Sequence, residues 1–137
     1  VKSEGAWCEG LPIACSETFS VEKSLLITGF GYEHGDLWEQ NMTLFKHFTN
    51  TTQGVRRLGA AAVDICHVAS GKADGFWEYD LNPWDTAAGF LIAKEAGCVI
   101  TNMAGNQYSI YDNNILIANL HIHKKLLKEI KSIQTDL

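Results

Sequence analysis

The chain has 137 residues, of which 46% are hydrophobic and 20% are charged, and its formal net charge is −5 at pH 7. These values are close to the averages of globular proteins, and they exclude a disordered, collagen-like or low-complexity chain. The length fits one domain. The acidic balance argues against a sequence-independent nucleic-acid binder, which needs a basic face. No apolar run approaches the roughly 20 residues of a membrane span, so we expect no membrane partner either.

The start of the chain and its cysteines bear on where the protein resides. The sequence begins at Val1 with no Met, basic segment or apolar segment, so we expect a piece of a longer protein whose targeting signal would lie upstream. The four cysteines show no zinc-ligand spacing, and Cys66 and Cys98 lie in apolar stretches typical of buried, reduced thiols. This pattern favours an intracellular protein.

Strand and helix patterns alternate along the chain. We expect a hairpin at residues 5–16. Three strand–helix pairs follow, at 24–29 and 36–50, at 54–58 and 59–69, and at 75–79 and 83–97. Two further strands at 99–101 and 115–118 and a last helix around 124–133 complete the chain. Asp36 is a suitable N-cap for the first helix, and Pro83 is favoured in the first turn of the third. The alternation predicts an α/β fold in which helices cover a sheet.

Two carboxylates flank the third crossing from strand to helix. Glu78 lies near the end of its strand, and Asp85 lies in the first turn of the next helix. Both have a simple structural interpretation, since Asp85 can cap the helix and Glu78 can face solvent. Ligands of open α/β sheets gather where strands end and helices begin, however, so both are also candidates for a binding site. The residues alone favour capping over metal binding at Asp85.

Other polar or small residues give weaker signals. At the second crossing, Gly59, Ala60 and Ala61 could bring backbone N–H groups to an anion or a hydroxyl, although tight packing is the simpler interpretation. The histidines show no partner spacing, and we expect Asp64 and Asp74 at the surface or as caps. The lysines of the last helix predict a solvated face.

The stretch Pro83 to Gly89, which reads Pro-Trp-Asp-Thr-Ala-Ala-Gly, resembles the C-terminal signature of the inositol monophosphatase family. The segments 5–10, 59–64 and 71–78 are similar to further family segments in the same order, and the likeness covers essentially the whole chain. The sequences of residues 54–71 and 83–97 are most similar to the cyanobacterial and plastid branch, which implies a cytoplasmic protein, or one of the plastid stroma if it comes from a photosynthetic eukaryote. The resemblance implies the C-terminal half of a layered αβα sugar-phosphatase fold. Residues 1–16 would then be a hairpin of the N-terminal domain's sheet, and 17–137 the C-terminal α/β domain.

The same resemblance implies a Mg²⁺-dependent, lithium-sensitive phosphomonoesterase that hydrolyses myo-inositol monophosphate, with water attacking phosphorus in line with the ester oxygen. Asp85 would be the catalytic and metal-binding carboxylate beside the substrate, and Glu78 would accept hydrogen bonds from sugar hydroxyls. Gly59, Ala60 and Ala61 would contact the ring; relatives often have Ser or Thr at position 60, and Ala60 offers no hydroxyl. The complete protein would be a homodimer.

One departure from the family leaves alternatives open. The family's other metal ligands come from a Gly-Glu-Glu segment and an Asp-Pro-Ile/Leu-Asp-Gly-Thr segment N-terminal to the hairpin, and neither occurs in residues 1–137. Because Mg²⁺ prefers about six oxygens, Asp85 alone cannot hold it for catalysis, and we expect this chain by itself to be inactive. Alternatives are a related phosphatase for histidinol phosphate, a sugar bisphosphate or adenosine bisphosphate, or a non-catalytic assembly module that keeps the fold.

Overall fold

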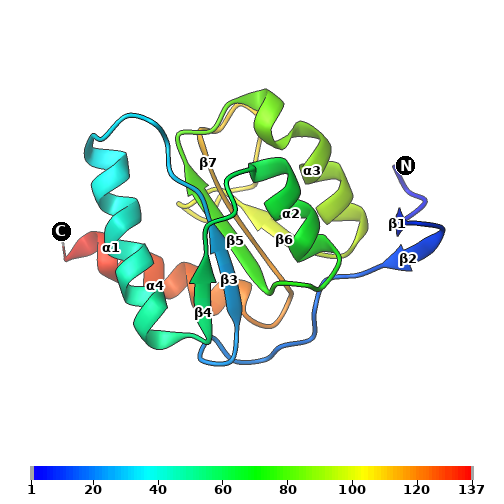
Figure 1. Cartoon of the computed structure of the whole chain (residues 1–137), viewed down its shortest axis with the longest axis horizontal. Helices are drawn as coiled ribbons and strands as arrows, with labels where there is room; N and C mark the ends of the chain where they lie inside the picture. Colours follow the sequence, from blue (N-terminus) through cyan, green and yellow to red (C-terminus); the bar gives the residue numbers. More distant parts are fainter. Residues whose placement is uncertain (1, 137) are drawn as a thin grey trace.

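Alternating side chains on the central strands build two apolar layers on opposite faces of one sheet. The computed structural model describes residues 2–136, and in it β5 (Gly75–Tyr79) directs Phe76 to one face and Trp77 to the other. The first face is covered by α2 (Ala61–Ala69) and α3 (Pro83–Glu95). The second is covered by α1 (Asp36–Thr51) and α4 (His123–Thr135), which gives the three layers seen in Figure 1. The predicted αβα architecture is confirmed.

The sheet has five strands in the order β4-β3-β5-β7-β6. The remaining strands of this sheet are β3 (Leu25–Thr28), β4 (Gly54–Arg56), β6 (Val99–Thr101) and β7 (Asn114–Ala118). Strands β4, β3 and β5 run parallel, whereas β7 is antiparallel to both β5 and β6. The carboxyl ends of the three parallel strands therefore meet at one edge of the sheet.

Three predicted helix ends are corrected by the backbone. Gly59 has φ +93° in the left-handed region, so the helix predicted from Gly59 begins at Ala61 instead. Asp36 is the first helical residue rather than the N-cap, which is Gly35. The third helix ends at Glu95, because Gly97 also has a left-handed φ and turns the chain away.

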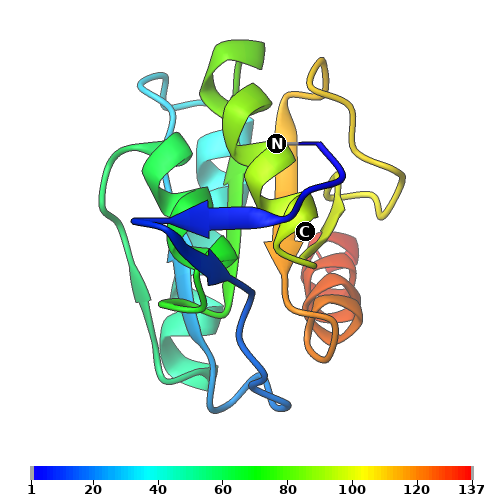
Figure 2. The ribbon, with the colours of Figure 1, turned by 90° about the vertical axis from the view of Figure 1, so that its right-hand side faces the viewer.

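The N-terminal hairpin forms a two-stranded sheet of its own from β1 (Ala6–Cys8) and β2 (Leu11–Ile13). In Figure 2 it crosses in front of α2 and α3. The Glu95 carboxylate, at the end of α3, accepts hydrogen bonds from the backbone N–H of Ser3 (2.8 Å) and of Gly5 (3.0 Å). Trp7, on β1, is 60% exposed. That the hairpin belongs to the sheet of another domain stays a prediction.

We expect the Glu95→Ala variant to release the start of the hairpin. The two backbone N–H donors lower the pKa of Glu95 from its ordinary value of 4.5, so their contribution is complete above that value and is lost as the pH falls through the lowered pKa. In the wild type, the amide proton shifts of Ser3 and Gly5 should titrate with Glu95; in the variant they should be pH-independent. Glu4→Ala, at an exposed glutamate in the same segment, is the control. Unchanged amide shifts in Glu95→Ala would contradict the anchor.

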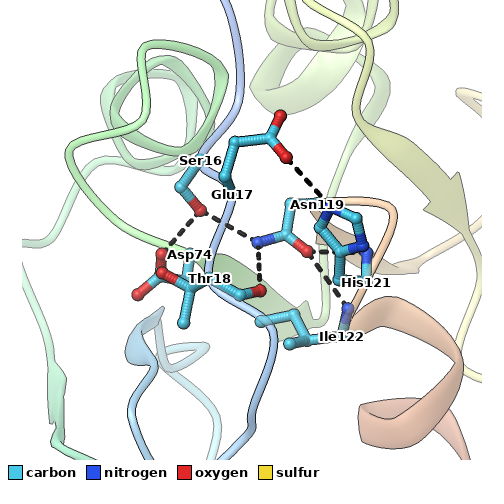
Figure 3. Close-up of polar contacts among 7 residues, drawn as sticks. All are labelled: Ser16, Glu17, Thr18, Asp74, Asn119, His121 and Ile122. Atoms are coloured by element: carbon cyan, nitrogen blue, oxygen red, sulfur yellow. Dashed lines mark hydrogen bonds and ion pairs between the residues drawn. The ribbon is translucent and has the colours of Figure 1, made fainter.

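A polar clamp at the other edge of the sheet, drawn in Figure 3, ties the segment after the hairpin to the domain. Asp74, expected at the surface or as a cap, is instead 8% exposed and accepts from the Ser16 hydroxyl (2.6 Å) and the Leu25 N–H (2.7 Å). The Asn119 amide donates to Ser16 Oγ (2.9 Å) and to the Thr18 carbonyl (3.0 Å). Burial of these groups is possible because each has a partner.

Predictions about the cysteines are confirmed in part, and the prediction about the lysines of the last helix is confirmed in full. All four cysteines are free thiols; Cys66 and Cys98 are half-buried rather than fully buried, and burial raises the pKa of both. Among residues 2–136, no helix combines the length and the apolar character needed to cross a membrane. The four lysines of α4 are exposed, as predicted.

Candidate functional site

The edge where the parallel strands end contains a polar cavity of about 500 Å³. It is enclosed by the segments that follow β3, β4 and β5 and by the first turns of α2 and α3, which is the usual place for a ligand in an open α/β sheet. All five residues singled out from the sequence line it, namely Gly59, Ala60, Ala61, Glu78 and Asp85. The structure thus brings together two crossings that lie far apart in the sequence.

Glu78 has the most perturbed environment in this cavity. Its side chain is half-buried, and its Oε2 atom is fully buried without a hydrogen-bond partner. Burial, followed by the negative charges of Asp64 and Asp85, raises the pKa of Glu78 to about 7, while the Arg57 guanidinium acts in the opposite direction. A buried acceptor with no partner inside the protein is suited to a donor brought by a ligand, such as a hydroxyl group.

Asp85 has the structural role that its position predicts. Its Oδ2 accepts a hydrogen bond from the Asn82 backbone N–H at 2.9 Å, which is the arrangement of a capping box at the start of α3. The half-exposed carboxylate also faces the cavity. Capping uses one oxygen, so it does not compete with binding of a cation by the other.

Asp64 contradicts the expectation of a surface or capping residue. It is 0% exposed on α2, and neither carboxylate oxygen has a partner. Burial raises the pKa of Asp64 to about 6, although the nearby His67 and Arg57 oppose this. The sequence hid this residue because the apolar face of α2 is continuous around it. Its charge acts on the cavity by raising the pKa of Glu78.

Several cavity residues were not singled out from the sequence. Arg57 lies just after β4, Gly29 and Gly31 follow β3, and Asp80 follows β5. The signal that could have found them is topological: once β3, β4 and β5 are parallel neighbours, whatever follows each strand must lie at the same edge. Arg57 is the cationic residue among those that line the cavity, and its positive charge acts to lower the pKa of Glu78 and of Asp64.

One carboxylate of the cavity has the chemistry of a ligand for a divalent cation. Within residues 2–136, no three or more His, Cys, Asp or Glu side chains are grouped so that they could hold a metal ion. Asp85 nevertheless supplies the oxygen chemistry that Mg²⁺ prefers, on the wall of the cavity and with one oxygen not used by the cap. Asp85 thus fits the chemistry of one ligand, and the His, Cys, Asp and Glu side chains of residues 2–136 form no complete set around it.

The domain is of the open α/β class, whose members bind ligands at the carboxyl ends of their strands, and here carboxylates line the cavity at that place. A sequence profile of the Inositol monophosphatase family matches residues 1–135, and the chain belongs to this family. The family as a whole depends on metal ions. The recognition made from Pro83–Gly89 and the segments before it is confirmed.

Three similar proteins show how much of the family's chain is represented. The chain is 57% identical over 133 residues to "Phosphatase IMPL1, chloroplastic" of Arabidopsis thaliana, covering 97% of this chain and 36% of that protein. It is 43% identical over 124 residues to "Inositol-1-monophosphatase" of Synechocystis, covering 90% and 43%. The structure of inositol monophosphatase from Anabaena superposes with a TM-score of 0.85 at 38% identity, covering 95% and 52%.

The chain thus spans about half, or less, of the length of these relatives. The matched part is the C-terminal half of the fold seen in the solved structures. The likeness to plant and cyanobacterial proteins agrees with the branch indicated by the sequence.

Proposed function

We propose that this chain forms the substrate-binding half of a Mg²⁺-dependent phosphomonoesterase that hydrolyses myo-inositol monophosphate to inositol and phosphate. The observation that supports it best is the cavity in which Glu78, Asp85 and the start of α2 meet, in a chain of the Inositol monophosphatase family. In the reaction, a water oxygen bonds to phosphorus, the P–O ester bond breaks, and the departing sugar oxygen takes up a proton.

In this proposal the residues of the chain divide into two groups. Asp85 would hold Mg²⁺ on the side of the leaving group while it continues to cap α3. Glu78 would accept hydrogen bonds from sugar hydroxyls through its partnerless oxygen, and the backbone at Gly59, Ala60 and Ala61 would contact the ring. Holding the ring in one orientation raises the rate, because it aligns the ester bond for attack. When bound, Mg²⁺ supplies positive charge that stabilises the phosphoryl oxygens and lowers the pKa of water.

The cavity also fits the size and chemistry of such a ligand. Its volume of about 500 Å³ lies within the usual range of small-molecule sites, and its lining combines carboxylates, backbone groups and the Trp84 side chain. Arg57 brings a positive charge for an anionic substrate to an otherwise acidic chain. These features favour a phosphorylated polyol over an uncharged sugar.

We expect Glu78→Gln to change substrate preference more than metal dependence. Glutamine keeps one carbonyl oxygen but loses the negative charge that Glu78 carries above its pKa of about 7, so in assays above that pH the preference for inositol 1-phosphate over p-nitrophenyl phosphate should fall by about tenfold or more. The Mg²⁺ concentration that gives half-maximal rate should stay unchanged. Both are measured by phosphate release in a protein of the relatives' length that carries this chain.

The matched control is Glu129→Gln, because Glu129 is also half-buried but pairs with His47 on the far side of the sheet (2.9 Å). It should alter neither quantity. A raised Mg²⁺ requirement in Glu78→Gln with unchanged preference would show that Glu78 binds the metal instead. Wild-type preference for histidinol phosphate, a sugar bisphosphate or adenosine bisphosphate over inositol 1-phosphate would replace the proposed substrate by the preferred one.

A further inference from the structure

The backbone beside Glu78 is closer to its carboxylate than any side chain would permit. Gly29 follows β3 directly, and a Cβ atom built on it would lie 2.3 Å from the Cδ, Oε1 and Oε2 atoms of Glu78. At this separation something must shift, and the group that gives way most easily is the Glu78 carboxylate at the end of its flexible side chain, so a Cβ at position 29 would displace it. The strand register explains why Gly29 lies so close to Glu78. Thr28, the last residue of β3, pairs with Trp77 on β5, and the residues that follow these two are Gly29 and Glu78.

Conformational freedom does not explain this glycine. Gly29 is not among the glycines with a left-handed φ, so an alanine could adopt its backbone conformation. What position 29 requires is empty space for the Glu78 carboxylate. A second glycine repeats the pattern, since a Cβ on Gly31 would lie 2.5 Å from Oδ2 of Asp80. The segment after β3 is therefore shaped around two carboxylates, that of Glu78 on β5 and that of Asp80 just after it.

A buried asparagine on α1 fixes that segment. Asn41 is 2% exposed, and its Nδ2 donates to the Gly29 carbonyl. Its Oδ1 accepts a hydrogen bond from Nε1 of Trp77 (2.6 Å), the residue before Glu78. Thr28 completes the arrangement by donating from its hydroxyl to the Trp77 carbonyl (2.7 Å). One amide side chain thus joins the residue that makes room for Glu78 to the residue that precedes it.

We propose that Asn41 is a positioning residue for the substrate site and that Gly29 is a specificity-determining position, because together they fix where the Glu78 carboxylate meets the sugar. Asn41 does not need to touch the substrate for this. Its side chain on α1 donates a hydrogen bond to the Gly29 carbonyl, and Gly29, which has no Cβ, leaves room for the Glu78 carboxylate. This inference rests on the proposed role of Glu78.

Two variants separate the parts of this arrangement. Gly29→Ala adds the Cβ that would displace the carboxylate. Asn41→Asp keeps an oxygen that accepts from Trp77 Nε1 but replaces the donor to the Gly29 carbonyl by a second oxygen. The matched control is Asn119→Asp, the same change at an equally buried asparagine (1% exposed) that donates two hydrogen bonds at the opposite edge of the sheet.

The first measurement compares kcat/KM for inositol 1-phosphate with kcat/KM for p-nitrophenyl phosphate, which has no ring hydroxyls, in the same full-length protein. We expect the ratio to fall by about tenfold in Gly29→Ala and in Asn41→Asp, chiefly through KM for the polyol phosphate. In Asn119→Asp it should be unchanged. An unchanged ratio in a folded Gly29→Ala, or an equal fall in Asn119→Asp, would overturn the proposal.

The second measurement needs no turnover. The ionisation of Glu78 is followed by ¹³C NMR of its carboxyl carbon, assigned by the signal missing in Glu78→Gln. In Gly29→Ala the pKa should fall by about one unit from about 7, because the displaced carboxylate is better hydrated while Asp64, Asp80, Asp85 and Arg57 remain in place. An unchanged pKa overturns the proposal. If the wild type fails to hydrolyse inositol 1-phosphate, the proposed function fails, and this measurement alone decides the placement of Glu78.

Discussion

Replacing Asp85 with asparagine should lower turnover of inositol 1-phosphate by about a hundredfold or more, while the melting temperature changes little. Asparagine keeps a side-chain oxygen that can accept from the Asn82 N–H, so the start of α3 remains capped. It lacks the negative charge that a Mg²⁺ ligand supplies, and losing one directly placed electrostatic group has an effect of this size. Phosphate release and thermal unfolding of the full-length protein measure the two quantities.

Asp112→Asn is a suitable control for this variant. Oδ2 of Asp112 accepts a hydrogen bond from the Ser109 backbone N–H at 2.9 Å, so the same atom type serves the same local purpose away from the cavity. That variant should leave both turnover and melting temperature nearly unchanged. If Asp85→Asn were as silent as Asp112→Asn, Asp85 would be a cap and nothing more.

The 137-residue chain by itself should show no Mg²⁺-dependent phosphatase activity. Mg²⁺ takes about six oxygens, and residues 2–136 contain no group of three carboxylate, imidazole or thiol side chains that could hold it. This chain covers 43% of the Synechocystis relative, so that protein has further residues that could supply metal-binding oxygens. The test is inositol 1-phosphate hydrolysis by the chain over a range of Mg²⁺ concentrations, with the Synechocystis protein as the positive control. Turnover comparable to that control would contradict the expectation and would mean that Asp85 and its neighbours suffice.

Local patterns were enough to predict most of the fold and five of the fifteen residues that line the cavity. Apolar runs ending at Gly or Pro marked the strands and helices, and their alternation predicted an α/β fold in which helices cover a sheet. Glu78 and Asp85 could be named because each stands at a crossing from strand to helix. Helix ends were less certain, since the left-handed conformation of Gly59 is not encoded by the Ala-rich pattern that follows it.

The residues that the sequence did not reveal depend on contacts between distant segments. Asp64 follows apolar neighbours on α2, and only the packed structure shows that it is buried and raises the pKa of Glu78. Asn41 lies 36 residues before the Trp77 indole that it accepts from, so no local spacing joins them. From the sequence, Gly29 could be interpreted only as the end of a strand, and its closeness to the Glu78 carboxylate follows from the strand register.

The clamp of Ser16, Asp74 and Asn119 bears on the order in which the chain acquires structure during synthesis. Ser16 and Asn119 are 103 residues apart, so their hydrogen bond cannot form until nearly the entire chain has left the ribosome. Contacts of such separation also carry a large loop-closure cost and form late in folding. The other half of the clamp can form earlier, because Asp74 lies only 58 residues after Ser16 and directly precedes β5. We therefore expect the clamp to form in two steps, with Asn119 joining Ser16 and Asp74 only after β7 has been synthesised.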